Sequence, residues 1–433
     1  MGAKIFVFCY YALMCVAYIF MLPILGFFRI FKPKYRASIP ARFFMWKNGG
    51  FKSARFAPEV WIHACSLGEI TSLKAILNKN ILQKNLILTT TTNTGFAKAN
   101  ELFGGRKNVA IRYLPFEIFI PFIMPKSLKK LVVLEAELWF MLFFCAKKNG
   151  AKSVLLNARI SAKSYPKYKK NAWFYRYLFG YADKVLCQQN ADKERLSELG
   201  AQNIEVIGNI KALSAPQTSA NLAIFTDFKR NLCELLDSPK SKAQDSRNLK
   251  VSRNPQDSHT KPTIIVAAST HRGEEELILR AFKANFTPFH RLIIAPRHPE
   301  RFGEVWEMIK AHGFKSTKYS QNGLDCESSV ILLDTLGELI NAYAIADCVI
   351  LGGSFVKMGG HNPLECAHFG TQIISGEHIF NQLALFALVE NYKIITNDEL
   401  IVVLGDLQNL PKSKIKDSAI IAMQRKIDEI FAN

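Results

Sequence analysis

Residues 5–28 form an apolar segment without a single charged side chain. A helix needs about 20 apolar residues to cross the hydrocarbon core of a bilayer, so this segment predicts an N-terminal transmembrane or membrane-anchor helix over residues 1–28. A secretory signal peptide would have a shorter apolar region and a small-residue cleavage site, and neither is evident. A buried core helix is the alternative, although such helices are usually shorter. Pro23 and Gly26 leave open a kinked helix that inserts only partly.

Basic residues are distributed unevenly around this segment. Only Lys4 precedes it, whereas the residues that follow include Arg29, Lys32, Lys34, Arg36, Arg42 and Lys47. By the positive-inside rule, the rest of the chain is expected in the cytoplasm. The net charge is +20, and basic clusters such as KSYPKYKK (163–170) attract either nucleic acid or anionic lipid. Because no nucleic-acid motif accompanies them, we expect an anionic membrane surface as partner and no nucleic acid, although a solvated basic face needs no ligand.

The nine cysteines stand singly, without a CxxC pair or a Cys/His cluster at zinc spacing. This pattern predicts free thiols in a reducing compartment rather than a disulfide framework or a structural metal site.

Short apolar runs alternate with helix-like stretches after the N-terminal segment. This alternation predicts βαβ units and parallel sheets. The expected strands lie at 60–64, 86–90, 131–135, 153–157 and 184–187 in the first half, and at 263–268, 291–296, 330–334, 348–351 and 372–375 in the second. Between the halves, residues 237–262 are rich in Ser, Lys, Asn and Gln and cannot bury a core.

The sequence therefore predicts two doubly wound, Rossmann-like α/β domains behind the N-terminal helix. We expect an N-terminal domain at 29–215, a polar linker or insertion at 216–262 and a C-terminal domain at 263–433. In open α/β sheets ligands bind at the carboxyl ends of strands, so a protein of this kind is expected to work in the cleft between its halves.

Two polar motifs follow strands of the first half. WIHACSLGEI (61–70) runs from a strand into a helix start and carries Ser66, Gly68 and Glu69. Glu69 either caps the first helical turn or takes part in catalysis, and the residues alone leave both open. The hydroxyls of LTTTTNTG (88–95) either cap a helix or contact the polar head of an acceptor.

Two further motifs of this half carry charged side chains. Glu135 and Glu137 end the apolar strand in VVLEAELW (132–139), where they form either a site or an N-cap with a salt bridge. Lys211 in VIGNIK (206–211) either faces an anionic group or is an ordinary surface lysine.

The second half begins with two motifs suited to anions. AASTHRGEEE (267–276) leaves a strand and enters a helix, so Ser269, Thr270 and the neighbouring backbone amides are expected to form a small anion nest. APRHPERF (295–302) places Arg297 at the next strand end, and a guanidinium suits phosphate recognition because it makes paired hydrogen bonds.

The segment ILGGSFVKMGGHNPLECAHFG (350–370) is the richest in glycine, and its two glycine pairs let the backbone approach a ligand closely. Asn362 and Pro363 open a helix that has Glu365 in its first turn. A capping box explains Glu365, and the alternative is a helix end that faces a phosphate while Glu365 holds a ribose hydroxyl. The glycine pairs favour the second reading. The chain has neither a P-loop nor a GxGxxG at the first strand, so NTP hydrolysis and dinucleotide redox chemistry are poorly supported.

In this order, the motifs resemble the bacterial Kdo (3-deoxy-D-manno-octulosonic acid) transferase family over about residues 5–400. The matching pieces are IHACSLGE, TTTTNTG, YLPFE, LEAELW, LNARIS, GNIK, AASTHRGEEE, PRHPERF, DTLGEL, GGSFVKMGGHNPLE and GEHIFN. The resemblance implies a GT-B fold and an inverting transfer of Kdo from CMP-Kdo to a lipid A precursor (lipid IVA) in lipopolysaccharide biosynthesis. It also implies no metal or other cofactor, and the inner (cytoplasmic) membrane with the catalytic domains on its cytoplasmic side.

The resemblance also assigns roles to individual residues. Glu69 would be the general base, while Glu135 and Lys211 would stabilise the transition state. The residues that would bind CMP are Pro296, Arg297, Leu336, Gly337, Glu338, Asn362, Pro363, Leu364 and Glu365. Additional site candidates are Ser66, Gly68, Glu137, Ser269, Thr270, His271, Gly353, Ser354, Gly360 and His361.

The chain departs from the family's pattern mainly on the acceptor side. Phe140 and Met141 stand where the family has Pro-Asn after ELW, Met358 replaces an Arg, and no Asp follows Ala212. Two other functions remain alternatives: a different GT-B glycosyltransferase with a UDP-sugar donor and a lipid-linked acceptor, and a non-catalytic protein that binds a membrane surface.

Overall fold

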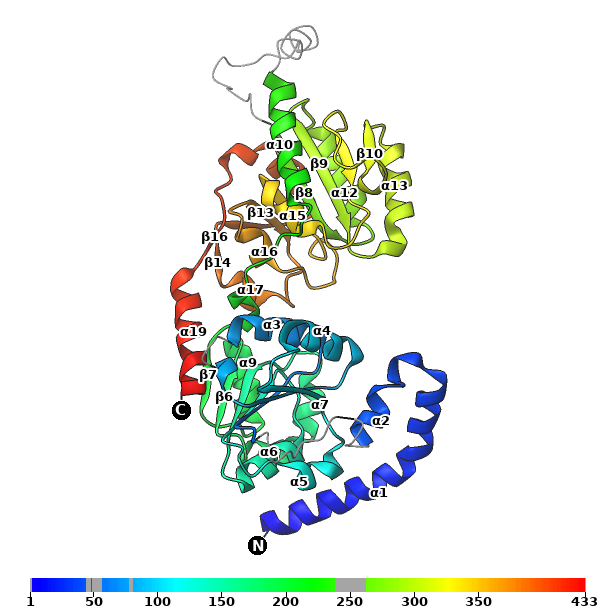
Figure 1. Ribbon diagram of the computed structural model, residues 1–433. Coiled ribbons are helices and arrows are strands. Elements are labelled where there is room, and N and C mark those ends of the chain that lie inside the picture. Colours follow the sequence, from blue (N-terminus) through cyan, green and yellow to red (C-terminus); the bar gives the residue numbers. More distant parts are fainter. Residues whose placement is uncertain (1, 44–47, 49–56, 78–80, 238–261, 433) are drawn as a thin grey trace. The chain divides into compact units, whose positions relative to one another are not determined.

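The computed structural model describes residues 2–43, 48, 57–77, 81–237 and 262–432, and the chain divides into two compact units. The first unit comprises Met1–Ser214 together with Ser418–Asn433, and the second comprises Ala215–Asp417. Each unit contains one seven-stranded sheet in which all neighbouring strands are parallel. The predicted pair of doubly wound α/β sheets is therefore confirmed (Figure 1).

The sheet of the first unit has the order β3-β2-β1-β4-β5-β6-β7. Its strands are β1 (Val60–His63), β2 (Leu86–Thr90), β3 (Val109–Tyr113), β4 (Lys130–Leu134), β5 (Lys152–Ala158), β6 (Lys184–Cys187) and β7 (Ile204–Val206). Its helices are α1 (Gly2–Phe31), α2 (Ser38–Phe43), α3 (Leu67–Ile76), α4 (Asn93–Phe103), α5 (Ile120–Ile123), α6 (Phe140–Lys148), α7 (Tyr165–Lys170), α8 (Ala172–Phe179), α9 (Asn190–Glu198) and α19 (Asp417–Ala432), with 3-10 turns η1 (Pro33–Tyr35), η3 (Ile81–Gln83), η4 (Glu117–Phe119) and η5 (Ile210–Leu213).

Alternate residues of the central strands point to opposite faces of this sheet. Trp61, Val133 and Leu155 belong to one core cluster together with the buried side chains of α5, α6 and α8. Figure 1 shows α3 and α4 on the other side of the sheet. Because helices cover both faces, β1, β2 and β4 are buried along their whole length, as expected of central strands in a parallel sheet.

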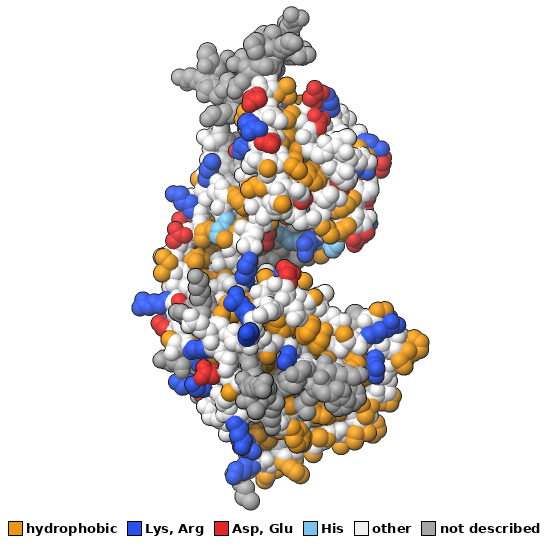
Figure 2. All heavy atoms as spheres, in the orientation of Figure 1, with side chains coloured by type: hydrophobic (Ala, Val, Ile, Leu, Met, Phe, Trp, Pro, Cys, Tyr) orange, Lys and Arg blue, Asp and Glu red, His pale blue; other side chains and the backbone are white. Residues whose placement is uncertain are grey.

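Helix α1 is long and apolar enough to cross a membrane, judged by its length and composition. Most of its large side chains are exposed, and Figure 2 shows them as a hydrophobic surface along the helix. Its first turns nevertheless pack on the unit. The ring of Phe6 stacks on Tyr177 with centroids 4.1 Å apart, and the Tyr10 hydroxyl donates to a carboxylate oxygen of Glu117 at 2.6 Å. Part of α1 thus has a fixed docking face on the first unit.

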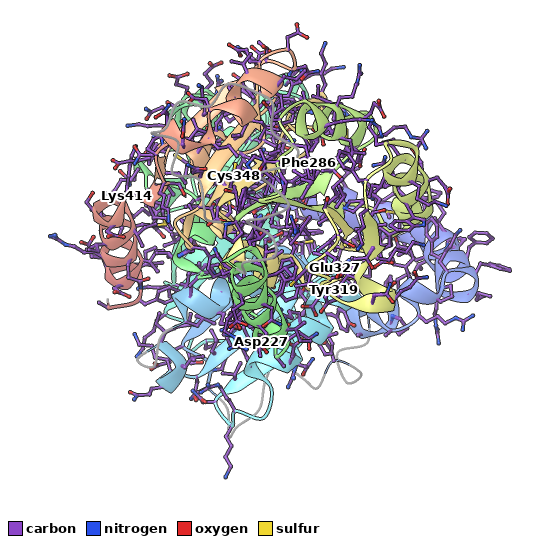
Figure 3. The ribbon with its side chains drawn as sticks, turned by 90° about the horizontal axis from the view of Figure 1, so that it is seen from above. Asp227, Phe286, Tyr319, Glu327, Cys348 and Lys414 are labelled. Atoms are coloured by element: carbon purple, nitrogen blue, oxygen red, sulfur yellow. The ribbon has the colours of Figure 1, made fainter. Side chains whose placement is uncertain are left out.

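The sheet of the second unit has the order β10-β11-β9-β8-β12-β13-β15. The strands of this unit are β8 (Thr263–Thr270), β9 (His290–Pro296), β10 (Ser316–Lys318), β11 (Val330–Leu332), β12 (Cys348–Leu351), β13 (Gln372–Gly376), β15 (Tyr392–Ile395) and the antiparallel pair β14 (Val389–Glu390) and β16 (Lys414–Ile415). Its helices are α10 (Leu222–Asp237), α12 (Glu274–Ala284), α13 (Phe302–Ala311), α14 (Tyr319–Asn322), α15 (Leu339–Ile345), α16 (Pro363–Ala367), α17 (Leu383–Phe386) and α18 (Leu400–Gly405), with 3-10 turns η6 (Pro299–Arg301) and η7 (Leu407–Asn409). Figure 3 labels Cys348, which begins the central strand β12 and is fully buried.

The prediction of a polar linker over residues 216–262 is wrong for the first part of that range. Helix α10 occupies Leu222–Asp237 and belongs to the second unit, where it contacts α15. Its apolar residues recur at helical spacing, so Phe225, Phe228 and Leu232 are buried on one face while Asp227, labelled in Figure 3, is exposed. The remainder of the expected linker, 238–261, lies outside the described residues.

The chain returns to the first unit at its end, although the sequence predicted a C-terminal domain that continues to 433. Helix α19 buries Met423, Ile427, Ile430 and Phe431. Two lysines of the first unit donate hydrogen bonds to its last carbonyls: Lys84 Nζ to Phe431 O at 2.7 Å, and Lys130 Nζ to Ile430 O. Cations at a helix C-terminus satisfy unpaired carbonyls and favour the helix dipole.

We expect Ile427→Ala to destabilise the first unit by about 2–5 kcal/mol, because it removes a fully buried side chain and leaves a cavity. Hydrogen–deuterium exchange, read separately in β6 and β12, would locate the loss in the first unit. Ile421→Ala is the matched control, since Ile421 lies on the same helix with 67% of its surface exposed. Its effect should stay within about 0.5 kcal/mol. Equal effects of the two substitutions would contradict a docked α19.

Candidate functional site

Glu69 lies in the first turn of α3, at the carboxyl end of β1, and is 8% exposed. Ser66 caps the helix: its Oγ accepts from Glu69 N at 3.3 Å and donates to Glu69 Oε1 at 2.7 Å. Cys65 N donates to Glu69 Oε2 at 2.8 Å. Burial raises the pKa of Glu69, the hydrogen bond from Ser66 opposes the rise, and the nearby charge of Glu135 adds to it. A buried carboxyl with a raised pKa is suited to take up a proton.

The threonine motif after β2 supports this turn. Thr90 Oγ1 and Thr92 Oγ1 both donate to the Cys65 carbonyl, at 2.7 and 2.8 Å, and Thr92 also caps α4. A Cβ atom at Gly95 would lie 2.5 Å from Thr90 Oγ1 and 3.2 Å from the Cys65 carbonyl oxygen. The capping interpretation of LTTTTNTG is therefore the one observed, and its glycine is needed for close approach of α4 to the Glu69 turn.

Glu135 and Lys211 are connected through Asn157, a residue that the sequence analysis did not select. Asn157 Nδ2 donates to Glu135 Oε1 at 3.4 Å, and Asn157 Oδ1 accepts from Ile210 N at 3.1 Å, next to Lys211. Glu135 and Asn157 both have a positive φ, of 55° and 59°. Such backbone strain in non-glycine residues is concentrated at functional sites. The position of Asn157 at the end of β5 was the signal that could have identified it.

The second glutamate of the EAEL motif has a structural partner. Glu137 Oε2 lies 3.5 Å from Nε2 of the fully buried His63 and accepts from Trp139 Nε1 at 2.8 Å. Burial favours the neutral carboxyl, but the hydrogen bonds and charge of His63 and the bond from Trp139 outweigh it and lower the pKa of Glu137. The surroundings of Glu137 therefore favour its ionised form, while Glu135 has no such histidine partner among the described residues.

The site residues predicted in the first unit thus lie around the start of α3. Glu135 and Glu137 both lie near enough to Glu69 to raise its pKa, and α3 contacts η5, which carries Lys211. The Lys211 side chain is exposed, and Gly68 lies in the same helical turn as Glu69.

In the second unit, one backbone amide of the AASTHRGEEE motif and three amides of the glycine-rich loop bind a carboxylate of the protein itself. Glu274, at the start of α12, is fully buried. Its Oε2 accepts from His271 N and Gly353 N, both at 2.8 Å, and its Oε1 accepts from Ser354 N and Phe355 N at 3.1 and 3.0 Å. Burial raises the pKa of Glu274, and these N–H donors oppose the rise. The sequence analysis missed this residue, although it follows the THRG motif directly.

The remaining nest residues are also part of the protein's interior. Ser269 is 9% exposed with a φ of 52°, and Thr270 is fully buried at the end of β8, where its carbonyl accepts from Arg297 N at 3.0 Å. The His271 amide beside them is engaged by Glu274, and an anion nest at Ser269 and Thr270 stays a prediction.

Gly353 lets two histidine rings approach the backbone. A Cβ atom there would lie 3.1 Å from His361 Cδ2 and 3.4 Å from His271 Cδ2, and the residue has a φ of 67°. Nε2 of His271 and Nε2 of His361 are 3.0 Å apart, with the rings stacked at 9°. Gly360 N closes the loop by donating to Gly353 O at 2.7 Å. One glycine of each pair therefore takes part in close packing around this loop.

The predicted CMP-binding residues lie at several loops of the second unit. Asn362 caps α16 through a 3.0 Å bond from Leu364 N and donates to Glu365 Oε1 at 3.1 Å, so the capping interpretation holds for this pair. Pro296 ends β9, and the side chain of Arg297 is exposed. A role in nucleotide binding for these residues stays a prediction.

The carboxylate of Glu338 has three partners within its own unit. It accepts from Asn221 Nδ2 at 2.8 Å, Asn341 Nδ2 at 2.7 Å and Ser219 Oγ at 3.3 Å. Leu336 is 74% exposed and Gly337 has a φ of 94°. Any ligand of this turn therefore meets the exposed backbone and Leu336 more readily than the engaged Glu338 side chain.

All nine cysteines are free, as predicted. Within the described residues, no group of three or more His, Cys, Asp or Glu side chains could hold a metal ion. The expected absence of a metal cofactor stays a prediction.

Known proteins are similar to this chain in sequence and in fold. Residues 37–214 match a family model described as 3-deoxy-D-manno-octulosonic-acid transferase. The 3-deoxy-D-manno-octulosonic acid transferase of Haemophilus influenzae is 31% identical over 398 residues, which cover 88% of this chain and 84% of that protein. That of Bordetella pertussis is 31% identical over 360 residues, or 79% of this chain and 76% of that protein.

The chain belongs to the Kdo transferase family. It is therefore a glycosyltransferase. Among solved structures, Anabaena HepE in complex with UDP-glucose has a TM-score of 0.51 at 13% identity and covers 86% of this chain and 99% of its own. The UDP-GlcNAc 2-epimerase of Neisseria meningitidis bound to UDP-GlcNAc has a TM-score of 0.50 at 11% identity, with the same coverage. These likenesses establish the GT-B fold of this Kdo transferase family member.

One departure from the family's pattern has a structural explanation. Phe140 and Met141 are buried, at 0% and 2% exposed, and the Phe140 ring packs against Phe6 and Tyr10 of α1 with centroids 5.4 and 4.8 Å apart. In this member of the Kdo transferase family, Phe140 belongs to the surface on which α1 docks, and Met141 is buried beside it.

Proposed function

We propose that this transferase moves Kdo from CMP-Kdo to a lipid A precursor, with inversion at the sugar. The observation that carries the proposal is the buried carboxyl of Glu69. Its pKa is raised by burial and it lies beside a second carboxylate, Glu135. An inverting transfer requires one base that removes the proton of the acceptor hydroxyl as its oxygen attacks the anomeric carbon.

The residues around Glu69 have distinct tasks in this mechanism. Ser66 and the Cys65 amide each donate to one oxygen of Glu69 and so fix its orientation. As the acceptor oxygen bonds to the sugar, the bond between the sugar and the phosphate oxygen of CMP breaks. Glu135 stabilises the positive charge that develops on the sugar ring, and Lys211 meets the negative charge of the leaving group.

CMP binds the second unit in this proposal. Arg297 contacts the phosphate, and the turns at 336–338 and 362–365 contact the nucleoside. Support for Arg297 comes from its exposed guanidinium, which has no acidic partner among the described residues. An unpaired guanidinium at a strand end suits an oxyanion. The proposal requires no metal, because the charge of a single departing phosphate is met by side chains.

Helix α1 anchors the enzyme to the membrane surface in the same proposal. Phe8, Leu13 and Phe20 of this helix are 74%, 65% and 75% exposed, and Trp173 of the adjoining α8 is 58% exposed. Burying such side chains in lipid is favourable, and the lysines of α7 and the residues before it would meet anionic head groups. We propose that the anchor lies in the inner membrane with both units on the cytoplasmic side.

Nucleotide preference tests the proposed donor. We expect the enzyme to bind CMP at least tenfold more tightly than UDP in calorimetric titrations, and to add Kdo to lipid IVA when supplied with CMP-Kdo, read as product mass. Arg297→Ala should weaken CMP binding roughly tenfold to a hundredfold, since charged hydrogen bonds contribute about 1.5–3 kcal/mol. Arg280→Ala, an exposed position on α12, is the control. Tighter binding of UDP would contradict the Kdo assignment.

A further inference from the structure

The second unit contains a cluster of basic side chains that the mechanism above uses only in part. Nε2 of His271 lies 3.0 Å from Nε2 of His361, and the ring of His298 lies 5.4 Å from that of His271, at 76°. Arg297 precedes His298 directly. Its charge reaches both His271 and His361, because it lowers the pKa of each. The cluster includes the positive charge of Arg297 and is built from the ends of β8 and β9 and the glycine-rich loop.

The acidic groups around the cluster are already engaged. Glu274 accepts four backbone N–H groups, including that of His271. Glu275 is paired with Arg301 through two bonds of 2.7 and 3.0 Å. Glu300 lies 3.7 Å from His298 on the exposed side. The pair of rings itself therefore has no carboxylate partner among the described residues.

The contact between the two rings limits their protonation. Two Nε2 atoms at 3.0 Å are within hydrogen-bond distance, so one of them carries a proton and the other accepts it. If both carried a proton, two N–H groups would face each other. The pair can therefore take up one extra proton but not two. Burial and the neighbouring cations lower the pKa of both rings, that of His361 to about 4, so the pair is neutral at pH 7 without a ligand.

We propose that the His271–His361 pair, with Arg297 and His298, forms an oxyanion subsite for the sugar-nucleotide donor that takes up one proton as the donor binds. An oxyanion bound among these groups offsets the positive charges that oppose protonation of the His271–His361 pair. The proton resides on the more accessible ring, His271, and His361 stabilises it by accepting from His271 Nε2. This inference rests on the proposed function for the identity of the donor. The oxyanion is the phosphate or the sugar carboxylate of that donor.

Calorimetry of the full chain in buffers of different ionisation enthalpy tests the proposal at pH 7.5. CMP is fully ionised at this pH, since the second pKa of a phosphate monoester is about 6. We expect uptake of roughly half a proton or more per CMP bound, and binding that weakens as the pH rises from 7 to 8.5. His271→Gln should abolish the uptake, flatten the pH dependence and weaken binding roughly tenfold at pH 7. His361→Phe should reduce the uptake in the same way, because the acceptor is lost.

Controls separate this inference from the donor assignment. His312→Gln, a histidine that faces Glu276 and the Met308 carbonyl, should leave the uptake unchanged. Uptake with CMP assigns the subsite to the phosphate, and uptake only with CMP-Kdo assigns it to the carboxylate. If UDP binds in place of CMP and His271→Gln abolishes its proton uptake, the subsite stands and the Kdo assignment falls. Binding of both CMP and CMP-Kdo without proton uptake, or uptake that persists in His271→Gln, overturns the proposal.

Discussion

Glu69→Gln should lower kcat by about 10³-fold while the enzyme still binds CMP-Kdo with nearly unchanged affinity. The amide preserves the shape of the side chain and can keep the hydrogen bond from Ser66 or from the Cys65 amide, but it cannot accept a proton from the acceptor. The measurement combines a turnover assay with a calorimetric titration of the donor. Loss of turnover with retained binding is the signature expected of a catalytic base.

The pH profile gives an independent test of the same role. Burial raises the pKa of Glu69 above its ordinary value of 4.5, so the Glu69 carboxyl loses its proton at a higher pH than an exposed glutamate does. The rate should therefore fall tenfold per pH unit below that raised pKa and reach a plateau above it. This acidic limb should vanish in Glu69→Gln. Glu101→Gln, which alters a glutamate that is exposed on α4, should retain both the limb and the turnover. Full turnover in Glu69→Gln would show that Glu69 is not the catalytic base.

Glu274→Gln should be among the most destabilising conservative substitutions in the second unit, with a loss of about 2–4 kcal/mol in its free energy of unfolding. Each carboxylate oxygen of Glu274 accepts two backbone N–H groups. An amide replaces one of these oxygens by an N–H₂ group, which cannot accept, so two buried donors lose their partner. Because the donors include Gly353 and Ser354, the glycine-rich loop should lose its conformation and nucleotide binding should fall with stability.

Glu276→Gln is the matched control for this substitution. Glu276 lies on the same helix, but it faces Arg280 and His312 at the surface, where ion pairs contribute little. Its substitution should change the free energy of unfolding by no more than about 0.5 kcal/mol. Denaturant titration with exchange measurements on β12 would report both values. A small effect of Glu274→Gln would mean that the four bonds do not hold the loop.

The sequence predicted the interior of both sheets and missed their edges. The ten strands expected from apolar runs are the interior strands, whereas β3, β7, β10 and β15 were not anticipated and lie at the sheet edges. An interior strand of a parallel sheet is covered on both faces, so it reads as a continuous apolar run. An edge strand such as β10 (Ser316–Lys318) is short and partly polar, and no periodicity distinguishes it from a loop.

The candidate site was predictable where a residue's chemistry is visible in its own motif. Glu69 and Arg297 follow strands, and that position alone made them candidates. Asn157 also lies near a strand end, but the contacts that place Asn157 and Glu274 in the site were not predictable, because they include partners that are remote in the sequence. Asn157 bonds to Ile210, and Glu274 bonds to Gly353. The anion nest expected at Ser269 and Thr270 stays a prediction, although the neighbouring His271 amide binds Glu274.

The return of α19 to the first unit has a consequence for modularity. The polypeptide passes from one unit to the other twice, near Ser214 and again near Asp417, so the first unit is not one continuous stretch of sequence. A single genetic crossover between the units would separate α19 from the surface that buries Ile427 and Phe431. Exchange of the second unit between relatives must therefore replace an internal segment and keep the C-terminal helix with the unit that carries Glu69.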